Sequence, residues 1–324
     1  MSHFTVLVIG SDIDGALAPF QENNMGDCPR QYLEFHDTEG EMLDEYETGT
    51  ATRVVMPDGS YKSPYDEAFR KKDETCFTGS THEVPAELER REVPFKELYA
   101  TFEQFVAEYH GTEERDPEKN RYGYWENPNR KWDWYQVGGR WTGYFKLKPG
   151  AYGETGRPGL MTARAKAGYA DSCRVADIDV EAMRAEAQAS AAAQYDAFHA
   201  VLAGRELPDF EKLLAEHGND ASEARKAYWG HPVIKELQAS REFSPFEYET
   251  YATTDRETYL RRARDGAVST FAVLKDGTWY ERGSMGWWGR VADEADADTW
   301  NAQFAALFDS LPSDTVVSVV DCHI

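Results

Sequence analysis

The segment His3-Phe-Thr-Val-Leu-Val-Ile-Gly10 is a nearly continuous apolar run, rich in β-branched residues and closed by a glycine. Such a run is typical of a strand that is buried on both faces of a sheet. The chain ends on a matching run, Thr315-Val-Val-Ser-Val-Val-Asp-Cys-His-Ile324. We predict that His3 to Ile9 and Val316 to Cys322 are neighbouring strands of one sheet, which brings the two ends of the chain together.

The segments before the last strand support this sheet. Residues 268–282 alternate on both sides of an Asp276-Gly277 turn and predict a hairpin, and residues 300–311 have the spacing of an amphipathic helix. Between Asp177 and about Arg264 the pattern is helical, with a long alanine-rich helix that ends near Gly204. We therefore predict an α+β fold with a mixed or antiparallel sheet built from both termini. Residues 1–176 and 265–324 would form the sheet domain, and residues 177–264 a helical insertion.

Three tryptophans lie close together around two glycines. Trp132, Trp134 and Trp141 fall within ten residues, and Gly138-Gly139 lies between them. Alternating aromatic and polar residues beside a Gly-Gly pair predict a β-hairpin that turns at the glycines, because a two-residue turn needs positive φ angles. In this hairpin Trp132 and Trp134 would share one face of the sheet.

A second aromatic segment, Gly283 to Gly289, contains two further tryptophans. We predict that a pocket between the two segments binds a nucleotide-like or nucleic-acid-derived ligand, with indole rings on a base and the Arg140 guanidinium on a phosphate. The alternative is that the tryptophans fill a core and that Arg140 pairs with Asp133. The predicted ligand-binding residues are Trp132, Asp133, Trp134, Arg140, Trp141, Trp287 and Trp288.

The paired ends would also bring polar side chains together. If the first and last strands are antiparallel, His3 lies beside Asp321 and His323, which share one face of their strand. Two imidazoles and a carboxylate are a ligand set for a divalent metal, and they are also groups that transfer protons. We predict a catalytic or metal site at His3, Asp321 and His323, with a divalent metal as the candidate cofactor. The alternative is a polar strand end without chemistry.

The remaining segments are less regular. From Pro19 to about Gly79 the chain is acidic and rich in Gly and Pro, which predicts loops with one short hairpin at Asp58-Gly59. Apolar spacing from Phe95 to Tyr109 predicts a helix that packs on the sheet. Residues 149–159 contain four glycines and two prolines and predict a loop, either a connector or a flap over a neighbouring pocket.

Composition bounds the partners. The chain has 324 residues and a net charge of −23, from 58 acidic and 35 basic residues, which opposes binding to a nucleic-acid backbone or an anionic membrane. The acidity is typical of a protein that stays dissolved, and it also suits a carboxylate surface that mimics nucleic acid. Four cysteines without a C-x-x-C pair, no signal peptide and no apolar run of about 18 residues predict a reduced, cytoplasmic protein outside the membrane.

Four segments carry a resemblance. The start of the chain to Gly10, the block Tyr124 to Trp141, the segment Phe271 to Gly289 and the ending Ser318 to Ile324 resemble a family of uncharacterised proteins from bacteriophages and bacterial genomes. The resemblance implies an intracellular, phage-linked protein and names no activity. We expect a protein that binds a nucleotide-like ligand, with its hydrolysis as the candidate reaction. The alternative is an acidic protein without chemistry that inhibits a host protein as a counter-defence inhibitor or DNA mimic.

Overall fold

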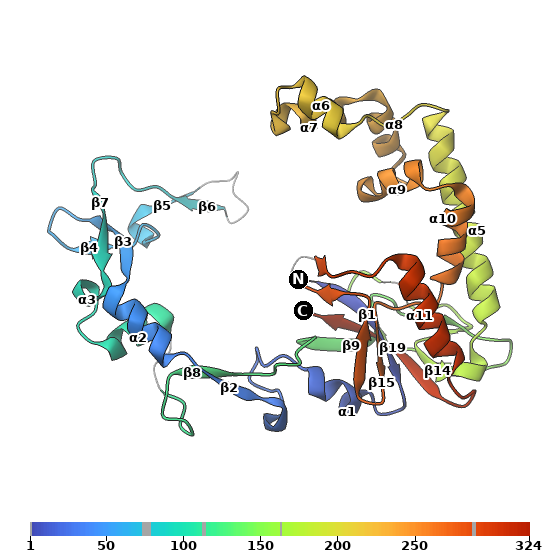
Figure 1. Cartoon of the computed structure of the whole chain (residues 1–324), viewed down its shortest axis with the longest axis horizontal. Helices are drawn as coiled ribbons and strands as arrows, with labels where there is room; N and C mark the ends of the chain where they lie inside the picture. The colour runs from blue at the N-terminus through green and yellow to red at the C-terminus, as the bar shows by residue number, and fades with distance from the viewer. Residues whose placement is uncertain (1, 73–78, 112–114, 163, 287–289) are drawn as a thin grey trace. The chain divides into compact units, whose positions relative to one another are not determined.

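The computed structural model describes residues 2–72, 79–111, 115–162, 164–286 and 290–324. It divides into two compact units (Figure 1). Met1–Asp27 and Asn129–Ile324 form the first unit, and Cys28–Pro128 form the second. The helical segment at 177–264 belongs to the first unit, together with the sheet that both ends of the chain form. Whether that segment can be removed as an insertion stays a prediction.

The sheet of the first unit is built on the two ends of the chain. β1 (His3–Ile9) is antiparallel to β19 (Val316–His323), with His3 opposite His323 and Ile9 opposite Val317. On its other side β1 is parallel to β15 (Ala272–Lys275), which forms a hairpin with β16 (Thr278–Glu281). This confirms three predictions. The two end strands are neighbours, residues 268–282 contain a hairpin, and the fold class is α+β.

Several short strands complete this sheet. β14 (Ser172–Arg174) pairs with the first residues of β19, and β9 (Trp134–Gly139) pairs with its last residues. β11 (Gly153–Glu154) extends the sheet from β14, and β12 (Arg157–Pro158) pairs with β9. The predicted loop at 149–159 therefore contains two short strands. The other short pairs are β10 (Phe145–Lys146) with β13 (Tyr169–Ala170), and β17 (Ser284–Met285) with β18 (Val291–Ala292).

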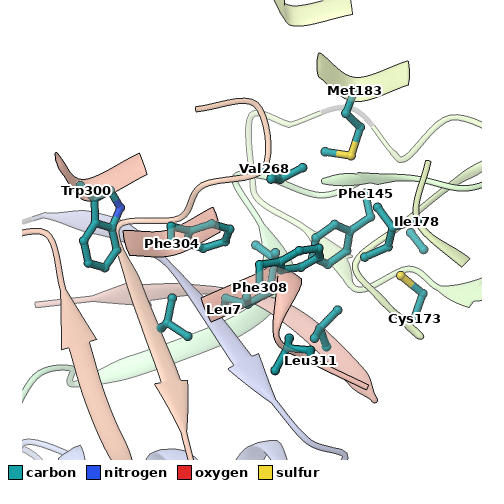
Figure 2. Close-up of a cluster of buried hydrophobic side chains, with 14 residues drawn as sticks. Leu7, Phe145, Cys173, Ile178, Met183, Val268, Trp300, Phe304, Phe308 and Leu311 are labelled. Atoms are coloured by element: carbon teal, nitrogen blue, oxygen red, sulfur yellow. The ribbon is translucent and has the colours of Figure 1, made fainter. Parts of the chain in front are cut away.

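Both faces of the sheet are covered. Figure 2 shows one face, on which Phe304 and Phe308 of α11 (Ala297–Asp309) pack with Leu7 of β1. On the other face Val6 and Val320 pack with α1 (Ile13–Leu17) and η1 (Ala18–Phe20). Because successive strand residues point to opposite faces, these two cores fix the face of every other residue of β1 and β19.

The prediction of a hairpin at Gly138-Gly139 is wrong. The strand that carries the glycines pairs with β19 and β12 instead of with the residues that follow the turn. The glycines do have the expected positive φ angles, +76° and +55°, at a tight turn closed by the Trp141 N–H on the Gly138 carbonyl. The pattern identified the turn, but it does not show which distant strand the β9 backbone pairs with.

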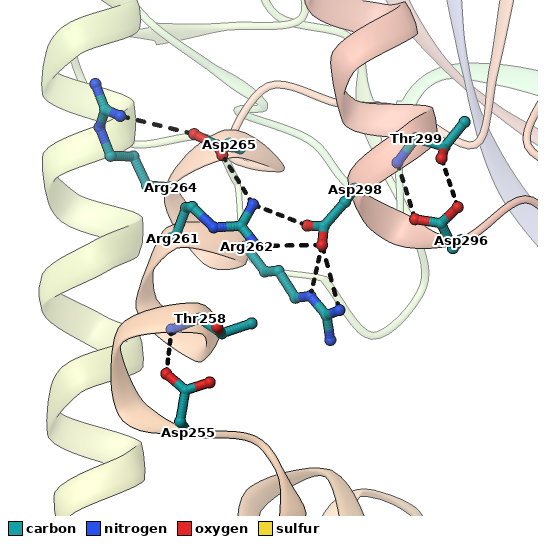
Figure 3. Close-up of polar contacts among 9 residues, drawn as sticks. All are labelled: Asp255, Thr258, Arg261, Arg262, Arg264, Asp265, Asp296, Asp298 and Thr299. Atoms are coloured by element: carbon teal, nitrogen blue, oxygen red, sulfur yellow. Dashed lines mark hydrogen bonds and ion pairs between the residues drawn. The ribbon is translucent and has the colours of Figure 1, made fainter.

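A bundle of helices in the first unit has its own core. Its helices are α5 (Val180–Leu202), α6 (Phe210–Glu216), α7 (Ala221–Gly230), α8 (Pro232–Ser240), η6 (Pro245–Glu247), α9 (Tyr248–Thr253) and α10 (Arg256–Asp265). Phe198, Ile234, Leu237 and Tyr248 are buried together in it, separately from the sheet cores. Figure 3 shows how the base of this bundle is attached to the sheet layer, through Arg261 and Arg262 of α10 and Asp298 of α11.

The second unit has a small core of its own, in which Phe95, Tyr99, Phe105, Val106 and Tyr122 are buried. The predicted helix from Phe95 to Tyr109 is broken at residues 99–101, where Thr101 caps a new helix with its side chain. It packs in this unit's core rather than on the main sheet, whereas the hairpin at Asp58-Gly59 is confirmed. The elements of the unit are η2 (Arg30–Tyr32), β2 (Glu34–Asp37), α2 (Glu39–Thr48), β3 (Thr50–Val55), β4 (Tyr61–Lys62), η3 (Glu67–Phe69), β5 (Arg70–Lys72), β6 (Ser80–His82), β7 (Arg90–Pro94), α3 (Phe95–Leu98), α4 (Phe102–Phe105), the π-helix Val106–His110 and β8 (Gly123–Glu126).

Across the part of the chain that the structure describes, we find no helix with the length and apolarity needed to cross a membrane.

Candidate functional site

Three aromatic side chains, here called the histidine row, come from three adjacent strands where β1 begins and β19 ends, and each ring contacts the other two. The pairing places His3 opposite His323 and His323 opposite Trp134. The two imidazole centroids are 4.9 Å apart with the rings edge to face, and the Trp134 indole is stacked on His323 at 5.1 Å with an interplanar angle of 18°. Trp134 also meets the edge of the His3 ring at 5.2 Å. The register of three strands therefore assembles this row.

Each histidine is held by a different carboxylate. Nδ1 of His3 lies 2.7 Å from Oδ1 of Asp321, and Nδ1 of His323 lies 2.6 Å from Oδ1 of Asp133. An ionised carboxylate only accepts hydrogen bonds, so Nδ1 of each ring donates and Nε2 is the basic nitrogen of the neutral ring. The structure thus contains two adjacent Asp–His pairs with the same tautomer.

Both carboxylates are fixed by further donors. Oδ2 of the buried Asp321 accepts the backbone N–H of Arg140 at 2.8 Å. Asp133 accepts the N–H of Trp134 at 2.7 Å and the side-chain amide of Asn24 at 3.3 Å. Because these bonds hold the carboxylates in place, they also hold the orientation of the two imidazole rings.

Gly139 makes the approach of Asp321 possible. A Cβ at this position would lie 2.4 Å from both Cβ and Oδ2 of Asp321. Gly138 allows the approach of a second buried carboxylate, Asp171. A Cβ on Gly138 would lie 2.5 Å from Oδ2 of Asp171. Asp171 accepts the Thr142 hydroxyl at 2.8 Å and the backbone N–H groups of Gly143, Tyr144 and Gly156 at 2.6, 3.1 and 2.8 Å. The two glycines therefore serve both the turn and the close packing of two aspartates.

The histidines are mostly covered and the tryptophan is not. The side chains of His3 and His323 are 9% and 6% exposed, whereas Trp134 is 43% exposed. If Trp134 served only to pack a core, its indole would be expected to be buried, because burial of a large aromatic ring is favourable. The row thus offers a flat apolar surface beside two basic nitrogens.

The other predicted binding residues have different roles. Trp132 is buried in the core under α1, where its Nε1 donates to the Leu17 carbonyl at 3.0 Å, so it does not share a face with Trp134. Trp132 bridges to Gln21 through backbone hydrogen bonds, and a bend at Asp133 separates it from β9, so the alternation assumed from the sequence does not hold. Trp141 is half-buried in the turn, and Trp287 and Trp288 lie outside the described residues.

Arg140 does not pair with Asp133. Its backbone N–H holds Asp321, while its side chain is exposed and has no ion pair with any residue that the structure describes. Asp133 instead belongs to the His323 pair. The Arg140 guanidinium is therefore available to an anion close to the histidine row.

Sequence reasoning brought His3, Asp321 and His323 together correctly, and it missed the participation of Asp133 in the same cluster. Asn24 and Asp171 were also missed, because their roles arise from loops whose positions have no local sequence signal. Cys322 points to the other face of the sheet, and burial raises the pKa of its thiol, which argues against a thiolate nucleophile at this position. Asp12 and Asp14 near the end of β1 cap a helix and bond Tyr135.

The predicted metal role finds no support in the geometry. Among residues 2–72, 79–111, 115–162, 164–286 and 290–324, no group of three or more His, Cys, Asp or Glu side chains is arranged to hold a metal ion. Two imidazole nitrogens supply too few protein ligands for the usual zinc site. The arrangement fits proton transfer better.

Comparisons of the chain with protein-family models, with curated proteins and with solved structures give no match.

Proposed function

We propose that the protein hydrolyses a phosphoester bond in a nucleotide-like ligand, with His3 and His323 as a general acid–base pair. The observation that carries this proposal is the pair of adjacent imidazoles, each fixed at Nδ1 by its own carboxylate and 4.9 Å apart between centroids. A hydrolase needs one group that takes a proton and one that gives a proton. Histidine can do either in the neutral pH range, so two histidines can supply both groups.

The reaction balances with water as the second substrate. One neutral imidazole takes a proton from water at Nε2 while the water oxygen forms a bond to phosphorus. The other imidazole, in its protonated form, gives its proton to the leaving oxygen as the bond from phosphorus to that oxygen breaks. Asp321 and Asp133 stabilise the imidazolium that forms on the ring each of them holds.

The surroundings supply binding groups for such a ligand. The half-exposed Trp134 offers a face on which a base stacks, a contact worth about 1–3 kcal/mol. Arg140, whose backbone N–H binds Asp321, supplies a planar guanidinium for the phosphate. The phosphate would then lie between a cation and two imidazoles, while the base lies on the indole.

The test uses His3→Gln and His323→Gln with His110→Gln as the matched control. His110 also bonds a carboxylate, Glu45, but it lies in the second unit. Hydrolysis of bis(p-nitrophenyl) phosphate and of cyclic and linear dinucleotides is measured between pH 5 and 9. We expect a bell-shaped rate profile and a loss of about 100-fold or more in each site variant, with the control unchanged. Hydrolysis that survives both site substitutions, or the absence of hydrolysis in the natural chain, contradicts the proposal.

One observation favours the alternative, an acidic inhibitor without chemistry. The Cys28–Pro128 unit carries 24 Asp and Glu against 12 Lys and Arg, so about half of the net negative charge lies in less than a third of the chain. That charge is compatible with a basic partner protein. The same experiment separates the two functions, because an inhibitor of this kind shows no hydrolysis and is insensitive to the histidine substitutions.

A further inference from the structure

We infer that the helical bundle contains a second binding site, for a small organic cation with an apolar stem. A cavity of about 750 Å³ lies between the end of α5, the connection at 203–209, α6, α7 and α9, which are yellow to orange in Figure 1. This volume is in the range of small-molecule sites. The site is separate from the histidine row and does not depend on the proposed hydrolysis.

Part of the cavity lining is apolar and aromatic. Leu202, Leu207 and Pro208 line it, together with the rings of Phe210 and Tyr228, which are 6.2 Å apart and edge to face. The faces of aromatic rings attract cations through their quadrupoles, and apolar side chains take up an alkyl stem.

The cavity lining also carries negative charge that the protein does not neutralise. Glu206, Glu211 and Glu249 line the cavity, and in the described part of the chain none of them has an ion pair. Burial raises the pKa of Tyr228, and the negative charge of Glu249 raises it further. A cation at this point would meet a carboxylate and a ring together.

The basic groups of the lining are already engaged. Arg205 makes two bonds to Glu236, at 3.1 and 2.6 Å, and donates to the carbonyls of Val201 and Leu202. Nε2 of His199 donates to the Tyr251 carbonyl at 3.0 Å. Asp209 caps α6, which leaves the three glutamates as the charges that a ligand meets.

The test compares three probes with the same six-carbon stem: hexylammonium, hexanol and hexanoate. Binding is measured by isothermal titration calorimetry at low ionic strength with the full chain. We expect the cation to bind about tenfold or more tightly than hexanol and hexanoate to show no binding, because the apolar stem is constant and only the head group changes.

Variants assign the binding to this cavity. Glu206→Gln with Glu249→Gln should weaken hexylammonium binding about tenfold, and Ala252→Trp should weaken it by filling the cavity without changing a charge. Glu257→Gln is the matched control, since this glutamate is exposed on α10 outside the cavity. Circular dichroism checks that each variant folds. No binding of the cation, equal binding of hexanol, or an equal loss in the control overturns the inference.

Discussion

Gly139 and Gly150 both have positive φ angles, +55° and +80°, but their surroundings differ. A Cβ on Gly139 would meet Asp321 at 2.4 Å, whereas a Cβ on Gly150 would meet nothing within 4 Å. We expect Gly139→Ala to destabilise the protein by roughly 2–4 kcal/mol, from backbone strain and the displaced carboxylate, and Gly150→Ala by about 1 kcal/mol. Urea unfolding measures both. Equal losses would show that only the φ angle matters.

Two buried tyrosine hydroxyls also give a matched pair. The Tyr144 hydroxyl donates to the Ser269 carbonyl at 2.6 Å, while the Tyr248 hydroxyl has no partner among the described residues. Tyr144→Phe should cost about 1 kcal/mol, because it leaves a buried carbonyl without its donor. Tyr248→Phe should be neutral or stabilising, since it removes a hydroxyl whose burial is not compensated. Thermal and urea unfolding should therefore show a loss of stability for Tyr144→Phe and none for Tyr248→Phe.

At the scale of elements, the junction of α10 and α11 depends on Asp298. Hydrogen bonds from Arg261 and then Arg262 hold the pKa of this carboxyl below its usual value of 3.8. A lowered folded-state pKa contributes stability that is fully present above the unfolded value and is lost as the pH falls through the folded value. We expect Asp298→Asn to lower Tm by no more than about 2 °C at pH 7, because the pair is exposed, and to have no effect at pH 2. A larger effect at pH 2 than at pH 7 would contradict this origin.

The helical bundle should be separable from the sheet, but not at the boundaries seen in the sequence. Deleting all of 177–264 would also remove Ile178 and Met183, which belong to the sheet core. Higher in the bundle α5 and α10 lie side by side, with Tyr195 against Tyr259 at 5.4 Å. We predict that replacing residues 195–259 by a short glycine-rich turn leaves a folded protein with cooperative unfolding. Aggregation of this variant together with loss of near-UV circular dichroism would show that the bundle is required.

The sequence predicted elements well where one segment determines its own structure. The end strands, the hairpins at Asp58-Gly59 and Asp276-Gly277, and most helices follow from local periodicity and turn residues. The strand that pairs with β9 could not be predicted in this way, because the pairing with β19 depends on residues about 180 positions away. Asp133 was missed as a partner of His323 for the same reason, although both lie in segments that the sequence singled out. The face of Trp132 was assigned wrongly because a bend at Asp133 interrupts the alternation.

At the scale of the whole molecule, the second unit leaves and rejoins the first at neighbouring points. Within the first unit the Glu22 N–H donates to the Trp132 carbonyl, and the Lys131 N–H to the Phe20 carbonyl. We predict that replacing Cys28–Pro128 by a short linker leaves the first unit folded, because both sheet cores come from outside this range. The variant should keep the hydrolysis proposed for the histidine row and lose about half of the net negative charge. Loss of folding on excision would show that the units depend on each other.

The pairing of His3 with His323 also has a kinetic consequence. The central contact of the sheet joins residues 320 positions apart, so its formation must close almost the whole chain into a loop. Contacts of such long range slow folding, and β1 lies between β19 and β15, where it cannot complete its hydrogen bonds before both are in place. The Asp–His pairs therefore belong among the last features to form during refolding. A chain cut between its two end strands carries His3 on one fragment and Asp321 with His323 on the other, so the His3–Asp321 pair forms only when the two fragments associate.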